Sequence, residues 1–212
     1  EMLPSAALAE TAAEKTQNGE NTADVYTVGE DTVVHSGESG EAAVHTNHPI
    51  CGDEDCTEND HKLPDNAEWV GVSTLDNYMA AGYYYLTNDV NLSDPWSPIN
   101  NVTLCLNGKI ITASSFADVI DMRAGKTITL CDCDTQGRGA VISDHRDGVG
   151  VYLNESTLNL YSGTITGTKY GVHLAQDNST FNMHGGSIKN SSTGVYMKAR
   201  PNITNVFNMT GG

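Results

Sequence analysis

The C-terminal third of this 212-residue chain contains a short repeat that constrains the fold more than any other feature of the sequence. Residues 158–165 read LNLYSGTI, residues 181–188 read FNMHGGSI, and residues 207–212 read FNMTGG. A second signature, in which Gly-Val precedes Tyr or His and then Leu or Met, begins at Gly150, Gly171 and Gly194. Successive copies lie 21 to 26 residues apart. Such a period is typical of solenoids, whose repeats bury their apolar faces by stacking on one another.

Each repeat contains several short runs in which apolar and polar residues alternate, and Gly, Asn, Asp and Ser separate these runs. No helix of useful length fits within one repeat. The sequence therefore predicts an all-β fold, a right-handed, single-stranded parallel β-helix over residues 67–212. Because a repeat is still in progress at Gly212, we expect further coils to follow.

Strand alternation predicts which side chains point outward. In the first signature, an Asn lies between two inward-pointing apolar residues and should stack on its equivalent in the next coil. In the second signature, Tyr and His occupy the outward position and should form an aromatic stripe. Exposed rings on a flat sheet can stack on sugar rings, although such ladders also stabilise neighbouring strands. The predicted ligand-binding residues are Tyr152, His173, Tyr196, Asn159 and Asn182.

Residues 47–66 form the densest cluster of metal-binding side chains, and we interpret them as a compact Cys/His knob. Two Cys and two His follow the order His-x2-Cys-x4-Cys-x4-His, which could close a tetrahedral zinc shell. The segment has little apolar content on which to fold otherwise. The alternative is a disulfide between the two cysteines, and His45 could replace one of the ligands. The predicted ligands of this structural zinc are His48, Cys51, Cys56 and His61.

Three further cysteines lie in the repeat region. Cys105 and Cys131 occupy equivalent positions in successive coils, so they should lie about 4.8 Å apart on neighbouring strands. Cys133 is left without an equivalent. The three cysteines could bind a metal together, but we interpret them as small residues stacked in the wall of the β-helix.

The N-terminal region differs in composition from the rest of the chain. Residues 1–9 resemble the end of a secretory signal peptide, which implies a secreted or cell-surface protein. Residues 10–46 contain few large apolar residues and should form a disordered leader with at most one weak strand. A short helix over residues 74–81 should cap the first coil, because its apolar residues recur at helical spacing.

The chain is acidic, with 11 Lys and Arg against 27 Asp and Glu and a net charge of -16. Such a surface repels phosphate backbones and anionic lipid, which argues against nucleic-acid and membrane-surface partners. No apolar run is long enough to predict a transmembrane segment.

A catalytic role is the main alternative to binding. Polysaccharide lyases need a base, and glycoside hydrolases need two carboxylates at a defined separation. The strongest local match is the sequence DHRD at residues 144–147, and the other basic candidates are Lys109, Arg123 and Arg138. Such residues in a polar turn are usually solvated, so we predict no catalytic residue.

Residues 82–90 (GYYYLTNDV), 104–108 (LCLNG) and 129–133 (TLCDC) resemble segments of large secreted or wall-attached β-helix proteins of Gram-positive bacteria. These proteins open with a Cys/His-rich knob like residues 48–61 and belong to the wider pectate-lyase-like class. The resemblance covers residues 45–212 and implies a surface protein, but it supplies no catalytic motif. We therefore expect a non-catalytic adhesin or glycan-binding stalk, with a polysaccharide lyase or glycoside hydrolase as the first alternative and a structural spacer as the second.

Overall fold

The computed structural model describes residues 24–28, 31–35, 45, 47–113, 115, 117–176, 178–199 and 204–212, and the chain divides into one unit up to Ala43 and a second from Val44. In the first unit, β1 (Asp24–Val28) pairs antiparallel with β2 (Asp31–His35). The sequence predicted at most one weak strand here, but two short segments can satisfy each other's backbone groups by pairing. The predicted signal-peptide remnant and most of the predicted leader lie outside the described residues.

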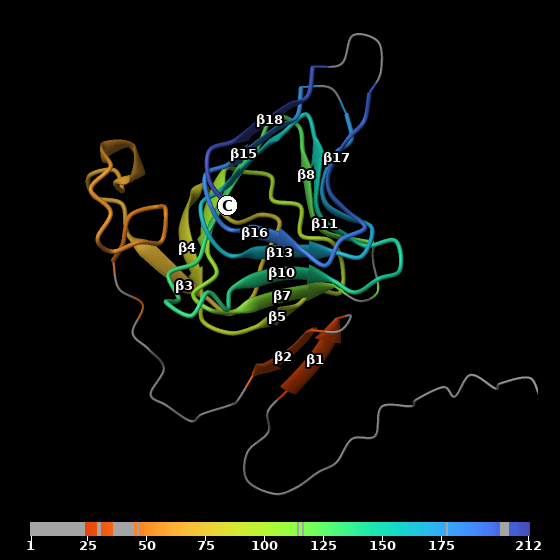
Figure 1. Cartoon of the computed structure of the whole chain (residues 1–212). Coiled ribbons are helices and arrows are strands. Elements are labelled where there is room, and N and C mark those ends of the chain that lie inside the picture. The colour runs from red at the N-terminus through yellow and green to blue at the C-terminus, as the bar shows by residue number, and fades with distance from the viewer. Residues whose placement is uncertain are drawn as a thin grey trace, which may run out of the picture. The chain divides into compact units, whose positions relative to one another are not determined.

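The second unit is a parallel β-helix, as the repeat predicted, and its three sheets surround one core (Figure 1). Every strand pairing that the structure describes in this unit is parallel. The seven-stranded sheet contains β3 (Trp69–Val72), β4 (Gly82–Leu86), β6 (Val102–Cys105), β9 (Thr127–Cys131), β12 (Thr157–Leu160), β15 (Thr180–Met183) and β18 (Val206–Met209).

The other two sheets complete each coil. The five-stranded sheet contains β5 (Val90–Asn91), β7 (Ile110–Ala113), β10 (Ala140–Ser143), β13 (Thr164–Gly167) and β16 (Ser187–Lys189). The four-stranded sheet contains β8 (Asp118–Arg123), β11 (Val149–Asn154), β14 (Tyr170–Leu174) and β17 (Thr193–Met197). A complete coil therefore contributes one strand to each sheet, and equivalent residues of successive coils become neighbours.

The register of the strands confirms the predicted inward positions. Leu158 pairs with Phe181 and with Ile128, and all three side chains are fully buried. The inward residues of the first two copies of the second signature, Val151, Leu153, Val172 and Leu174, are buried in the same core, whereas Met197 of the third copy is 39% exposed. Since each coil covers the apolar residues of its neighbour, burial depends on stacking rather than on any single strand.

Glycine recurs in the repeat at positions where the backbone conformation or a close contact excludes a Cβ atom. Gly163 lies at a corner between β12 and β13 with φ of 89°, where residues with a Cβ are strained. A Cβ at Gly150 would lie 2.4 Å from the Cγ2 of Ile165 and 2.7 Å from the carbonyl oxygen of Gly171. The recurrence of glycine in the repeat therefore reflects both a left-handed corner and a close approach between coils.

The predicted capping helix over residues 74–81 does not form; the segment consists of turns and extended residues. The Asp76 side chain accepts a hydrogen bond from the backbone nitrogen of Tyr78 (2.9 Å), and local bonds of this kind compete with helix formation. The carbonyl of Asn77 instead accepts from the nitrogen of Ile99 (2.9 Å), on a neighbouring loop. Leu75 and Met79 still pack against the core, so the segment covers the first coil without being helical.

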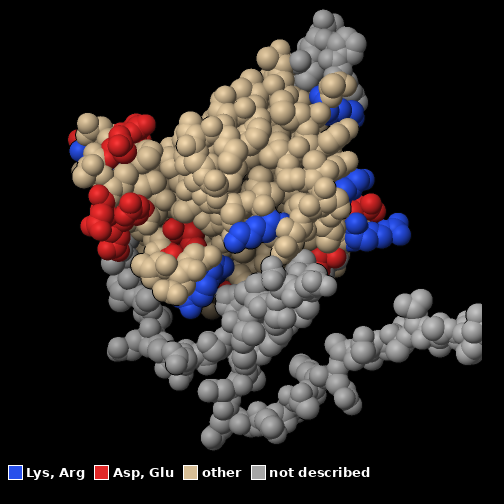
Figure 2. All heavy atoms as spheres, in the orientation of Figure 1, with Lys and Arg blue, Asp and Glu red and all other residues tan. Residues whose placement is uncertain are grey.

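Acidic side chains are gathered on the Cys/His knob, where Figure 2 shows two acidic patches beside the β-helix. Its exposed acidic residues are Asp53, Glu54, Asp55, Glu58, Asp60 and Asp65. The described part of the chain contains a single helical element, the three-residue 3₁₀ turn η1 (Asn59–His61). None of the described helical structure is therefore long and apolar enough to cross a membrane.

Candidate functional site

Four potential metal ligands converge where the Cys/His knob meets the wall of the β-helix. His45 and His48 come from the start of the knob, Cys105 ends β6, and Cys133 lies two residues beyond the end of β9. One ligand atom from each residue lies within 4.8 Å of the other three. Two imidazoles and two thiols form a donor set that suits a closed tetrahedral zinc shell.

The two histidines present the nitrogen atoms that a metal would require. The Nδ1 atom of His48 lies 2.6 Å from the carbonyl oxygen of Pro49, to which it can only donate, so Nε2 carries the free lone pair. This Nε2 lies 3.0 Å from the Nε2 of His45. A hydrogen bond from Trp69 Nε1 to the carbonyl oxygen of His48 (2.9 Å) fixes the backbone of this almost fully buried residue.

Aromatic side chains of the first coils hold the rings in place. The ring of His45 stacks on that of Tyr85 with centroids 3.9 Å apart and an angle of 6° between the planes. Trp69 contacts both histidine rings, at 5.5 Å from His45 and 4.6 Å from His48. The imidazoles therefore lie in an apolar enclosure built by β3 and β4.

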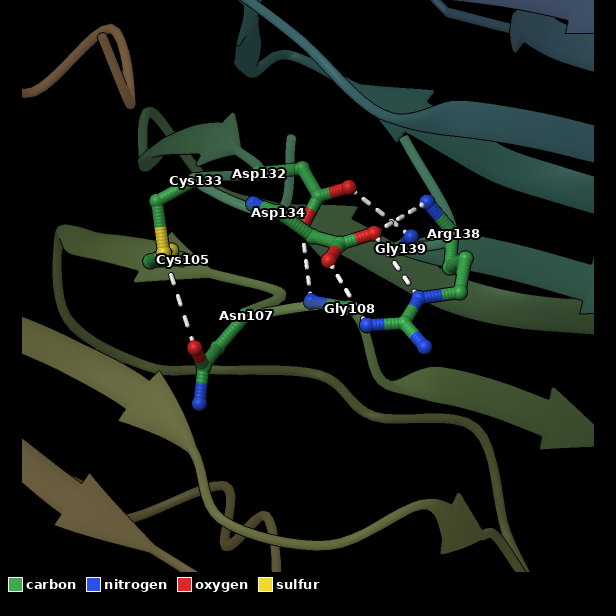
Figure 3. A network of polar contacts seen from close by, with 8 residues as sticks. All are labelled: Cys105, Asn107, Gly108, Asp132, Cys133, Asp134, Arg138 and Gly139. Carbon is green, nitrogen blue, oxygen red and sulfur yellow. Dashed lines mark hydrogen bonds and ion pairs between the residues drawn. The ribbon is translucent and has the colours of Figure 1, made fainter. Parts of the chain in front are cut away.

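The two sulfur atoms complete the group. The Sγ atoms of Cys105 and Cys133 lie 3.3 Å apart, and the thiol of Cys133 points to the Asn107 side-chain oxygen at 3.5 Å (Figure 3). The hydrogen bond with Cys105, followed by burial, raises the pKa of Cys133 to about 12, so metal binding must displace a proton. Ideal zinc bond lengths give tetrahedral N···N and S···S separations of about 3.3 and about 3.8 Å, so the observed pairs need only a small expansion.

Asp132 positions the turn that carries Cys133. Its carboxylate accepts hydrogen bonds from the backbone nitrogens of Gly108 (2.7 Å) and Gly139 (2.8 Å), as Figure 3 shows. Its own backbone nitrogen donates to the Ser162 hydroxyl (2.7 Å), which donates in turn to the carbonyl oxygen of Cys51 (3.0 Å). This chain of contacts joins three coils to the knob.

The four predicted zinc ligands do not form one shell. His48 belongs to the group just described, whereas Cys51, Cys56 and His61 form a second group whose ligand atoms lie within 4.8 Å of one another. In this second group the Cys56 Sγ lies 3.2 Å from the His61 Nδ1. Linear spacing suggested a single site because it does not show that the chain turns between His48 and Cys51.

Comparison of the chain with family models, curated proteins and solved structures gives no match. The function must therefore be inferred from the chemistry of the described residues.

A second candidate site is an aromatic surface on the four-stranded sheet, formed by Tyr152, Tyr170, His173 and Tyr196. The ladder aligns Tyr152 with His173 and His173 with Tyr196, and ring centroids along it lie 5.1 and 5.0 Å apart. Tyr170, which the sequence analysis did not single out, stacks on Tyr196 at 4.5 Å with an angle of 9° between the planes. Burial, followed by the charges of Lys198 and Lys169, lowers the pKa of His173 and favours a neutral ring.

An acidic pair that the sequence analysis missed continues this surface. The register places Asp121 beside Tyr152, and the almost fully buried Asp121 forms an ion pair with Arg123. Asp118 lies three residues before Asp121 on the same strand. Strand pairing, which linear spacing does not show, places Asp121 next to an aromatic residue.

Replacing Asp118 with Asn is expected to stabilise the protein near neutral pH and to have little effect near pH 4 (about the pKa of a free carboxyl). Burial, and then the charge of Asp121, raises the pKa of Asp118 to about 6. The folded state thus keeps a proton that the unfolded state releases, so the free energy of unfolding falls as the pH rises from about 4 to about 6. Asn is uncharged throughout and avoids this loss. Urea unfolding of both proteins across that range measures the difference, and a pH-independent difference would contradict the prediction.

The predicted Asn ladder lies on another sheet. The Asn182 side-chain nitrogen donates to the Asn159 side-chain oxygen (2.9 Å), and Asn159 donates to the Thr129 hydroxyl (3.1 Å). The ladder continues from Asn208 to Asn182 at 2.8 Å. Its amides are already engaged with one another, and they do not share a sheet with the aromatic rings.

The three arginines considered for a lyase lie in separate ion pairs, and Lys109 is half-buried. Arg123 pairs with Asp121, Arg138 pairs with Asp134 at 2.8 Å, and Arg146 lies 3.3 Å from Asp147. The side chain of Arg146 is largely exposed, as expected for a solvated turn. The DHRD segment therefore remains a surface turn in the structure.

Proposed function

We propose that this chain is a non-catalytic, secreted or cell-surface β-helix stalk that binds glycans through its aromatic surface. The observation that carries the proposal is the continuous set of contacting rings on a flat, parallel sheet. Tyr152, Tyr170, His173 and Tyr196 span three successive strands. Sugar rings present apolar C–H faces that stack on such rings, and a rigid sheet spends little conformational entropy on binding.

Charge favours a neutral glycan as the ligand. The chain carries a net charge of -16, and Asp118 and Asp121 lie at one end of the aromatic surface. Acidic polysaccharides would be repelled by these carboxylates. Hydroxyl groups of neutral sugars can instead accept from Lys169, whose Nζ lies 5.4 Å from the centroid of the Tyr170 ring.

Replacing Tyr152 and Tyr196 together with Ala is expected to weaken retention on neutral polysaccharides by about 5- to 150-fold. Each lost ring contact should cost about 0.5–1.5 kcal/mol, if sugar stacking resembles stacking between aromatic side chains. Affinity electrophoresis in gels that contain mannan, xylan or a β-glucan measures the retention. Tyr78→Ala is the matched control, because Tyr78 is 77% exposed and lies outside this surface.

The outcomes of this experiment separate the alternatives. Unchanged retention of the double variant would overturn the binding role of the rings. No retention by the parent chain on any glycan would favour the structural spacer. Release of reducing ends from the polysaccharide would favour the hydrolase, and Asp118 and Asp121 would then be the carboxylates to replace.

We further propose that His45, His48, Cys105 and Cys133 hold a structural zinc ion, and we call this group the metal clamp. Four protein ligands leave no position for water, which is typical of structural rather than catalytic zinc. The support comes from the donor set, its close approach and the hydrogen bond that orients His48. Zinc in the metal clamp would fasten the Cys/His knob to the coils that contain β6 and β9.

A further inference from the structure

We infer that Cys51, Cys56 and His61 form a second, independent zinc site, which keeps one coordination position open to a ligand from solvent. We call this group the loop site. The loop site would hold a second zinc ion in addition to the one in the metal clamp. This inference does not depend on the proposed glycan binding.

The two groups share no ligand. His48 donates through Nδ1 to Pro49 and directs Nε2 toward His45, so its metal-binding nitrogen is committed to the metal clamp. In the described part of the chain, no fourth His, Cys, Asp or Glu joins the loop site within the same 4.8 Å. Three protein ligands on a tetrahedral ion leave one position free, which is the pattern of zinc sites that bind water or substrate.

Backbone hydrogen bonds arrange the loop-site ligands. The nitrogen of Ile50 donates to the carbonyl oxygen of His61 (2.8 Å), which closes the loop around the two cysteines. A further turn bond from the Cys56 nitrogen to the Asp53 carbonyl oxygen (3.2 Å) brings the second thiol toward the first. These hydrogen bonds therefore hold the three metal-binding side chains close together, although the 3₁₀ turn η1 buries no residue.

The loop site borders a pocket of about 330 Å³. Its three ligand residues line the pocket together with Tyr161, His184 and neighbouring residues. Tyr161 stacks on His184 at 4.4 Å and contacts the edge of His61 at 4.7 Å, so this ring pair supports the imidazole ligand. The pocket has room for a small ligand bound to the open position.

Electrostatics favour a divalent cation here. Six exposed carboxylates lie on the knob, where Figure 2 shows acidic patches. Such a field concentrates cations. Two thiolates and one imidazole select a borderline-soft ion such as zinc over calcium or magnesium.

Metal and thiol analysis of the full chain tests the inference. Purified without reductant, the protein is expected to contain two zinc ions by mass spectrometry, and Cys56→Ser is expected to contain one. His48→Ala should also contain one, because it removes the metal clamp alone. Cys131→Ser is the matched control, since Cys131 belongs to neither group and should leave both ions in place.

The open position is tested with cobalt and azide. Cobalt(II) in tetrahedral thiolate sites gives visible bands that respond to a change of ligand. Azide is expected to shift these bands in the parent protein but not in Cys56→Ser, where the closed metal clamp alone holds cobalt. Bands that azide leaves unchanged in the parent protein would overturn the open position.

Other outcomes would overturn the second site itself. One zinc per chain, together with a Cys51–Cys56 disulfide by peptide mass spectrometry, would show that the loop is cross-linked rather than metal-bound. If the parent chain contains one zinc ion, which His48→Ala retains and Cys56→Ser loses, the ion lies in the loop site. This outcome would contradict the metal clamp and support the loop site. The two proposals can therefore fail separately.

Discussion

Replacing His48 with Ala is expected to remove one zinc ion per chain and to lower the thermal unfolding midpoint markedly. A ligand that binds only the folded state adds about 4 kcal/mol of stability when its free concentration exceeds Kd about 1,000-fold. His48 is almost fully buried and provides a correctly oriented Nε2. In the Ala variant, water therefore cannot replace this nitrogen as a metal ligand. Calorimetry with and without a chelator measures the loss.

The comparison with the chelator makes this result specific to the metal clamp. EDTA should lower the midpoint of the parent protein much more than that of His48→Ala. His145→Ala is the matched control, because this histidine lies in the DHRD turn and belongs to neither metal group. An equal effect of EDTA on the parent protein and on His48→Ala would contradict a stabilising role for the clamp.

Met183→Ala is expected to lower the free energy of unfolding by about 2–5 kcal/mol, whereas Met209→Ala should change it by no more than about 0.5 kcal/mol. The two residues are direct neighbours in the register of β15 and β18 and face the same side. Met183 is 5% exposed, but Met209 is 57% exposed, so truncation opens a cavity at one position and not at the other. Urea unfolding monitored by circular dichroism provides both values.

This pair of variants isolates the contribution of stacking. Residue type, sheet and ladder position are the same, and the main difference is the coverage that a following strand provides. Similar losses at both positions would show that intrinsic strand preference, rather than burial between coils, stabilises this sheet.

The sequence was sufficient to predict the solenoid, the inward residues and the Asn ladder. Leu158 and Phe181 are stacked for the reason that the repeat indicated, because period-2 alternation and a fixed period determine both face and neighbour. The helix over residues 74–81 was predicted wrongly. Its apolar spacing was real, but Asp76 and Asn77 bond to their own turn and to a neighbouring loop.

The metal groups show where linear spacing stops being informative. Cys133 lies beyond a strand end, so its contact with Cys105 depends on the turn that Asp132 holds. Cys131, the exact register partner of Cys105, was the more obvious candidate but is absent from the group. Two cysteines in the wall, His45 just before the knob and His48 within it could have indicated a joint site only if the docking of the knob had been known.

A zinc ion in the proposed metal clamp would make the first strands of the β-helix open together with later coils. In a one-dimensional repeat protein each coil contacts only its neighbours, so coils can open one after another. His45 and His48 lie within 4.8 Å of Cys105 and Cys133, which belong to the coils of β6 and β9. Peeling away β3 and β4 would therefore also break the coordination of residues in two later coils, and this part of the solenoid would open as one cooperative unit.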